Sequence, residues 1–233
     1  LLTPEKVTIE NIPDIADVNN LITQLMNMGV SVTRNGVGCY TFQANEINLD
    51  YIESDGASYI DTGIIPSATT RITARFKLAT AAAVNRAERQ YVFGTYDIEN
   101  GGAESRVQFY YGGSDSGQRA FAGFGASTQY AAITPDADEH LVTMNADRVV
   151  FDDAWTKTFD SIVFTNPRPI YLFACNEDGS VDHYSNGLQI EAVSVYDGNT
   201  RIARFVPAIR KMDGAVGMLD EDSGTFHVNQ GTG

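Results

Sequence analysis

Glu53 and Asp55 are residues whose types and spacing could do chemistry, in the stretch LDYIESDGASYIDTGI at residues 49–64. Two acids two positions apart on a β-strand project from the same face. The pattern E-x-D-x-x-E would place a nucleophile and an acid/base about 5–5.5 Å apart, as retaining glycoside hydrolysis requires. Here Ser58 occupies the third position, and Gly56 indicates a turn. We therefore interpret both acids as solvated residues at a hairpin end, and assign no catalytic residue.

A second set of oxygen donors lies in NEDGSVD, where Asn176, Asp178, Ser180 and Asp182 recur at two-residue steps. Carboxylate, amide and hydroxyl oxygens are the ligands that Ca²⁺ accepts. The stretch lacks a bidentate glutamate at the usual loop spacing, and a plain Asx/Gly turn is the competing interpretation. A calcium site at Asn176, Asp178 and Asp182 is one hypothesis, and no other cofactor is expected.

Aromatic side chains beside turns suggest a surface for sugars, because a ring face can stack on a sugar while acids and backbone groups bond its hydroxyls. Tyr110 and Tyr111 precede GGSDSG, and Trp155 follows a pair of aspartates. Neighbouring tyrosines on a strand point to opposite faces, so one of them should be exposed. We predict glycan binding through Tyr111, Asp115 and Trp155, with buried or rim aromatics as the alternative.

Composition narrows the class of protein. The 233 residues are 43% hydrophobic and 20% charged, as in a globular chain, with a net charge of −14. Such a charge disfavours nucleic acid and anionic membranes as partners, and no apolar run approaches the roughly 20 residues of a membrane span. Cys39 and Cys175 lie far apart, outside any metal-ligand spacing, so we expect two buried free thiols. The chain begins Leu1-Leu2 without a signal-peptide pattern, which indicates processing or a longer polypeptide.

The first 48 residues predict a small β-α-β-β unit. KVTIENI alternates as a strand does, and an apolar stripe from Ile15 to Met28 then recurs at helical steps. We expect this stripe to be buried against a sheet. VSVTR and CYTFQ read as two further strands joined by a tight turn at Asn35-Gly36.

From residue 49 onward the pattern changes to period two. RITARFKL places Ile72, Ala74, Phe76 and Leu78 on one face, and similar short runs follow between turn clusters such as ENGGAES and NEDGS. Many short strands of this kind predict an antiparallel jelly-roll sandwich over residues 49–233.

Two resemblances accompany these patterns. YIESDGASYIDTGI, IYLFACNEDGSVDHYSNGLQIEAVSVYDG and the closing run that starts at Arg204 resemble the laminin-G-like, concanavalin A-like jelly rolls. LLTPEKVTIENIPDIADVNNLITQLMNMGVSVTRNG resembles one repeat of the enolpyruvyl transferases, specifically the UDP-N-acetylglucosamine 1-carboxyvinyltransferase family. Glu53 and Asp55 match only the first two acids of the glucanase motif, and the catalytic residues of the transferases have no counterpart here.

These observations predict a mainly β chain with a small N-terminal unit at residues 1–48 and a concanavalin A-like jelly roll at 49–233. We expect a non-enzymatic module on a cell surface or virion, outside the cell, that binds a glycan or a protein and is compatible with a homo-oligomer. The alternatives are a glycoside hydrolase-like enzyme, an enolpyruvyl transferase relative, and a phage fibre or capsid decoration subunit that binds no glycan.

Overall fold

The computed structural model of the protein describes residues 6–27, 30–44, 46–80, 83, 88–98, 105–112, 120–160 and 164–233. Its elements in chain order are β1 (Val7–Ile9), α1 (Ala16–Asn27), β2 (Val30–Gly36), β3 (Cys39–Ala44), β4 (Glu46–Asn48), β5 (Ile52–Asp55), β6 (Ile60–Asp61), β7 (Thr70–Leu78), β8 (Gln90–Asp97), β9 (Ser105–Tyr111), β10 (Ala120–Gly125), β11 (Ser127–Ala131), β12 (His140–Met144), β13 (Arg148–Phe151), β14 (Trp155–Thr158), β15 (Tyr171–Leu172), β16 (Cys175–Glu177), β17 (Ser180–Asp182), β18 (Asn186–Asp197), β19 (Thr200–Arg210), β20 (Ala215–Asp220) and β21 (Phe226–Val228).

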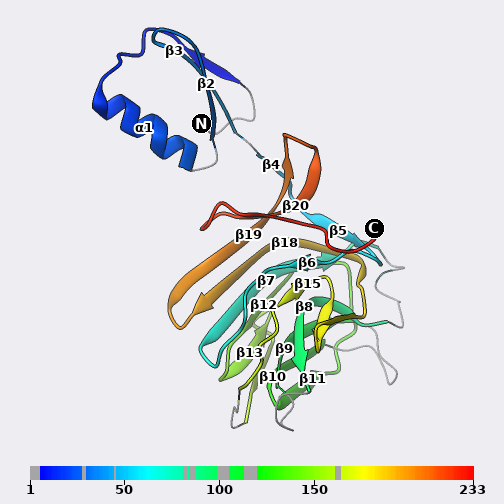
Figure 1. Ribbon diagram of the computed structural model, residues 1–233. Helices are drawn as coiled ribbons and strands as arrows, with labels where there is room; N and C mark the ends of the chain where they lie inside the picture. Colours follow the sequence, from blue (N-terminus) through cyan, green and yellow to red (C-terminus); the bar gives the residue numbers. More distant parts are fainter. Residues whose placement is uncertain are drawn as a thin grey trace.

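Most strands form a sandwich of two sheets, seen in the lower part of Figure 1. The front sheet has the order β11-β10-β9-β8-β15-β6, with β16 beside β8 and β17 paired to β16. The back sheet has the order β14-β13-β12-β7-β18-β19-β20-β21, with β4 against β19 and β5 against β18. Pairing is antiparallel apart from β16 with β8. The predicted antiparallel jelly roll is confirmed.

The core between the sheets follows directly from the alternation in the sequence. Along β7, each apolar residue from Ile72 to Leu78 is at most 1% exposed, while the charged residues between them face outward. Phe109 from the front sheet meets Phe76 and Phe151 from the back sheet, with ring centroids 5.9 and 5.7 Å apart. Burying both inner faces in this way is the main stabilising contribution of a sandwich.

The stretch at residues 49–64 differs from the predicted hairpin. β5 pairs with β18 in the back sheet, whereas β6 pairs with β15 in the front sheet, so the turn at Gly56 carries the chain from one sheet to the other. Glu53 and Asp55 share the outer face of β5, as alternation requires. Glu53 accepts a hydrogen bond from Gln189 Nε2 at 2.8 Å, and Asp55 accepts one from Ala57 N at 2.9 Å.

The N-terminal unit has the predicted strand-helix-strand-strand order, and its sheet runs β1-β3-β2. It lies apart from the sandwich in Figure 1, beyond β4. The predicted turn at Asn35-Gly36 is wrong by two residues, because β2 continues through Gly36 and the turn falls at Val37 and Gly38. The left-handed backbone, with φ of 65°, is at Gly38, where a side chain would meet the backbone of Ile12.

The apolar stripe of α1 is less buried than predicted. Ile15, just before the helix, and Leu21 and Met26 within it are 53%, 55% and 54% exposed. Val18, Ile22 and Leu25 are partly buried. The helix has the expected period, but the small sheet covers only part of its apolar face. Met28 lies outside the described residues.

The division near residue 48 stays a prediction, although β4 at residues 46–48 belongs by its pairing to the back sheet.

Both cysteines are free, but only Cys175 is buried; Cys39 is partly exposed. Within the part of the chain that the structure describes, no helix has the length and apolar character needed to cross a membrane.

Candidate functional site

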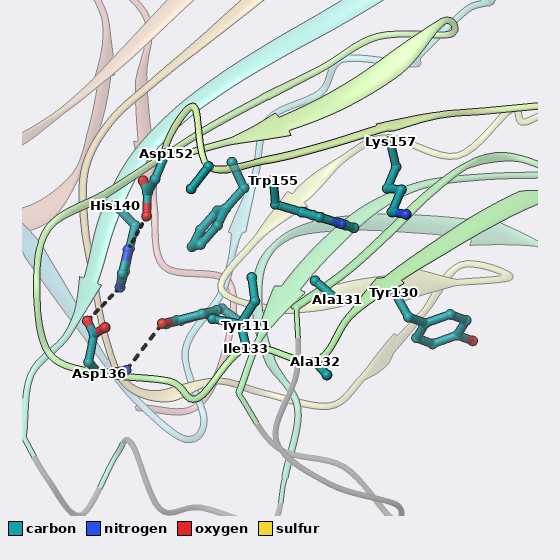
Figure 2. A pocket seen from close by; sticks show the side chains of 12 residues that line it. Tyr111, Tyr130, Ala131, Ala132, Ile133, Asp136, His140, Asp152, Trp155 and Lys157 are labelled. Atoms are coloured by element: carbon teal, nitrogen blue, oxygen red, sulfur yellow. Dashed lines mark hydrogen bonds and ion pairs between the residues drawn. The ribbon is translucent and has the colours of Figure 1, made fainter.

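A cleft with a volume of about 510 Å³ lies where the two sheets end on the same side of the sandwich. There β11 is the edge strand of the front sheet and β14 the edge strand of the back sheet. Gln129 Nε2 donates a hydrogen bond to Thr158 O at 2.8 Å and so ties the two edges together. The residues that line this edge cleft, most of them labelled in Figure 2, are Tyr111, Tyr130, Ala131, Ala132, Ile133, Asp136, His140, Phe151, Asp152, Ala154, Trp155 and Lys157.

A buried histidine organises one end of the edge cleft. His140 Nδ1 lies 2.7 Å from Asp152 Oδ2, and His140 Nε2 lies 3.0 Å from Asp136 Oδ1. Both ring nitrogens of His140 therefore lie within ion-pair distance of a carboxylate. The histidine side chain is 6% exposed, against 32% for Asp152 and 52% for Asp136. The ring thus joins the segment before β12 to the turn after β13, as Figure 2 shows.

Aromatic packing fixes the position of His140. Its ring stacks on Phe151, with centroids 5.1 Å apart and planes 29° apart, and meets Tyr111 edge-on at 4.6 Å. Asp152 is held as well, because its Oδ1 accepts a hydrogen bond from Leu141 N at 2.7 Å. The left-handed turn at Asp152, with φ of 50°, directs its carboxylate back onto β12.

Tyr111 lines the cleft as predicted, but its ring cannot be a stacking surface because it is 0% exposed. Its hydroxyl accepts a hydrogen bond from Asp136 N at 3.2 Å. Burial raises the pKa of Tyr111 to about 12, so the phenol stays neutral. The expectation that Tyr110 or Tyr111 is exposed was wrong. Tyr110 is 3% exposed, because it stacks on Phe121 at 4.7 Å and meets the ring of Tyr91 at 5.3 Å.

Trp155 is the predicted residue best placed to contact a ligand. It is partly buried at the start of β14, where it packs on the core while lining the cleft. Its Nε1 finds no acceptor among the residues the structure describes. Lys157, two positions along the same strand, also lines the cleft, and Tyr130 contributes a ring that is 49% exposed. The structure therefore brings Tyr111 and Trp155 to one cleft, while Asp115 lies outside the described residues.

Sequence reasoning missed His140, Asp136 and Tyr130. The available signal was the DADEH spacing, which puts Asp136 four residues before His140 at the start of a strand. Only the fold shows that Asp152, twelve residues further on, closes around the same ring.

The structure does not bring the predicted calcium ligands together. In the β16–β17 hairpin, Asn176 is paired with Val181 and Cys175 with Asp182, so Asn176 and Asp182 point to opposite faces. Asn176 Oδ1 accepts a hydrogen bond from Gly179 N at 3.0 Å, and Asp178 Oδ1 accepts one from Ile98 N at 2.8 Å. Ser180 shares the face of Asp182, not that of Asn176. Among the described residues, no group of three or more acidic, histidine or cysteine side chains could hold a metal ion.

One short segment of the chain is closely similar in sequence to known proteins. The chain is 56% identical over 55 residues to UDP-N-acetylglucosamine 1-carboxyvinyltransferase of Bacteroides fragilis, and equally identical over 55 residues to that of Porphyromonas gingivalis. The match covers 24% of this chain and 13% of each relative, so the chain spans only a small part of the curated relatives it matches. No protein-family model matches the chain.

Solved structures match the chain only weakly. The IT-sialidase CBM40 of Ruminococcus gnavus matches with a TM-score of 0.46 and 16% identity, over 65% of this chain and 91% of that one. A putative β-glucanase of Mycobacterium abscessus matches with a TM-score of 0.38 and 12% identity, over 71% and 73%. The chain therefore joins a segment similar to part of a carboxyvinyltransferase to an antiparallel β-sandwich.

Proposed function

We propose that the protein is a non-enzymatic glycan-binding module and that the edge cleft is its binding site. The observation that carries this proposal is the side chain of Trp155, a partly exposed ring that lines a cleft whose acids are already oriented. A volume of about 510 Å³ suits one or two sugar rings. Trp155 and Tyr130 supply ring faces, and Asp136, Asp152 and Lys157 supply hydrogen-bonding groups at the rim.

Binding fits this cleft better than hydrolysis does. Glycoside hydrolysis needs one carboxyl group that gives up a proton and another that attacks or activates water. Here one imidazole contacts both carboxylates, and Asp152 also accepts from a backbone N–H. Such contacts fix the two acids as hydrogen-bond acceptors. We further propose that the module acts outside the cell, on a cell surface or a particle.

Trp155 is the only tryptophan of the chain, so its fluorescence reports on the edge cleft alone. A broad glycan array followed by fluorescence titration with each hit should show saturable change in the emission of the folded protein. Trp155→Ala should weaken binding by about 10-fold, as measured by calorimetry, since a stacking contact contributes about 0.5–1.5 kcal/mol beyond area burial. Tyr51→Ala is the matched control, because Tyr51 is 41% exposed and does not line the cleft. An array without hits, or equal affinity for the Trp155→Ala variant, would remove the support for this site.

A further inference from the structure

A second group of aromatic side chains lies at the other edge of the front sheet. The rings of Tyr59 and Tyr171 have centroids 4.6 Å apart, and those of Tyr59 and Tyr184 are 6.2 Å apart. Tyr171 is on β15 and Tyr59 directly precedes β6, whereas the edge cleft adjoins β11. The strands β10, β9 and β8 separate the two places, so this tyrosine cluster is a separate surface.

The three side chains of the tyrosine cluster differ in solvent exposure. Tyr171 is 8% exposed and forms its base, Tyr59 is partly buried, and Tyr184 is 37% exposed. A row of rings that ends in an exposed face is the shape that a flat, partly apolar ligand can stack on. Tyr171 lies directly opposite Asp61 on β6, which places a carboxylate on the same face of the sheet.

A cavity adjoins the cluster. Its volume is about 290 Å³, and Tyr59 and Phe173 form part of its wall. Ile52 and Ile60 give it an apolar side, while Glu53, Ser58 and Asn229 give it hydrogen-bonding groups. Asn229 is itself fixed, because its Oδ1 accepts hydrogen bonds from Tyr59 N at 3.1 Å and Gly231 N at 2.8 Å. The combination of ring faces, an apolar wall and polar groups matches the requirements of a sugar site.

The phenols of the cluster stay neutral hydrogen-bonding groups. Burial, followed by the charge of Asp61, raises the pKa of Tyr171 to about 12. Burial also raises the pKa of Tyr59, with contributions from Tyr184 and Asp61. Both phenols therefore stay uncharged throughout the physiological range, and because they share a hydrogen bond, one of the two hydroxyls remains to donate to a ligand.

The negative charge around the cavity indicates which class of sugar could bind there. Glu53 lines the cavity and Asp61 lies beside the rings, in a chain whose net charge is −14. An anionic sugar would be repelled here, whereas an uncharged one would not. The structure thus favours a neutral saccharide over an acidic one.

Two residues with left-handed backbone lie beside the same rings. Phe173, two residues after Tyr171, has φ of 66°, and His183, directly before Tyr184, has φ of 51°. Histidine is among the residues that adopt this conformation more readily, but a bulky residue such as Phe173 rarely does so, and it persists there only where surrounding contacts impose it. Ser185 imposes it here, because its N–H donates to Phe173 O at 2.8 Å and its hydroxyl donates to Tyr91 O at 2.9 Å. The strained positions flank Tyr171 and Tyr184, so the cluster is held in a fixed shape before any ligand arrives.

We propose that the cavity at Tyr59, together with the exposed ring of Tyr184, is a second saccharide-binding site that takes a neutral sugar. It does not depend on the edge cleft binding glycan. If both sites bind, one molecule engages a polysaccharide at two points on opposite edges of its front sheet, which raises its avidity for a polymer.

The test uses the whole chain and four neutral trisaccharides: maltotriose, cellotriose, xylotriose and chitotriose. Binding is measured by calorimetry and by saturation-transfer-difference NMR up to about 10 mM, with Trp155 fluorescence recorded in parallel. We expect at least one sugar to bind the Trp155→Ala variant, and Tyr184→Ala to weaken that binding about fivefold to tenfold. Tyr51→Ala, at an exposed tyrosine outside both sites, should change nothing.

Three results would overturn this second site: no binding of any of the four sugars, loss of all binding in Trp155→Ala, or undiminished binding in Tyr184→Ala. Thermal unfolding of each variant checks the fold, and Tyr59→Phe, which keeps the ring, gives a second test through the hydroxyl alone. Binding that survives Trp155→Ala and is lost with Tyr184→Ala would support this site even if the edge cleft binds no sugar.

Discussion

Asp220 is expected to be the acid on which the C-terminal hairpin depends most. Asp220 lies at the end of β20 and is only 5% exposed, although the acidic stretch LDEDSG is typical of a solvated turn. Asp220 Oδ1 accepts hydrogen bonds from Arg204 N at 2.9 Å and Asp222 N at 3.1 Å, and its Oδ2 accepts one from Ser223 Oγ at 2.5 Å. The carboxylate thus joins β19 to the turn between β20 and β21.

The stability that Asp220→Ala should lose follows from those three hydrogen bonds. A hydrogen bond to a charged partner contributes about 1.5–3 kcal/mol, and a buried donor left without a partner costs about 1–3 kcal/mol. Because the neighbouring turn is exposed, water can replace some of the hydrogen bonds that are lost in Asp220→Ala. We expect a loss of roughly 3–5 kcal/mol in the free energy of unfolding, or a fall in Tm of about 10 °C for a chain of this length.

Urea unfolding followed by Trp155 fluorescence measures this loss, with an unchanged m value showing that the denatured state is unaffected. Asp222→Ala, two residues away, is the control. Asp222 forms an exposed ion pair with Arg201 at 2.8 Å, and such pairs contribute little to stability. The burial argument is refuted if the two variants lose the same stability, or if Asp220→Ala unfolds like the native protein.

Three other predictions follow from the described residues. Phe109→Ala, at a ring that is 0% exposed, should cost about 3–5 kcal/mol in urea unfolding, and a loss below about 1 kcal/mol would contradict the described packing. The backbone N–H of Ala57 lowers the pKa of Asp55, so its carboxylate stabilises the fold above the unfolded-state pKa, and this contribution disappears as pH falls through the lower folded-state pKa. Asp55→Asn should therefore flatten the acid side of a plot of Tm against pH, whereas an unchanged slope would show that Asp55 plays no part. Because Asn176 and Asp182 face opposite ways, neither Ca²⁺ nor a chelator should move Tm, and a rise with Ca²⁺ would restore the calcium site.

The sequence predicts the sandwich well because period-two burial is a local property. The alternation along β7 is visible in eight letters, and the described strand follows it residue by residue. The β-α-β-β order at the N-terminus was found for the same reason. What α1 packs against is not local, so the exposure of Leu21 and Met26 could not be read from their spacing.

The candidate site was predicted only in part, since its residues come from distant strands. Tyr111 and Trp155 were named from their aromatic character and nearby turns, and they do line one cleft. The predicted exposure of Tyr111 was wrong, because a sheet face covered by aromatic neighbours can exclude water as completely as the core does. The role of His140 depends on acids 4 residues before it and 12 residues after it, and only the folded strands bring these three together.

The last strand and the segment after it bear on how the protein folds. Gln230 N donates to Tyr59 O at 2.9 Å, and Thr232 N donates to Ala57 O at 3.1 Å, so residues near the C-terminus, marked beside β5 in Figure 1, meet the segment that leads from β5 to β6. The bond from Tyr59 N to Asn229 joins residues 170 positions apart. Contacts of such long range form late and slow folding, because the loop between them must first be closed. During synthesis on a ribosome, the segment from β5 to β6 therefore waits for its partners until almost the whole jelly roll has emerged.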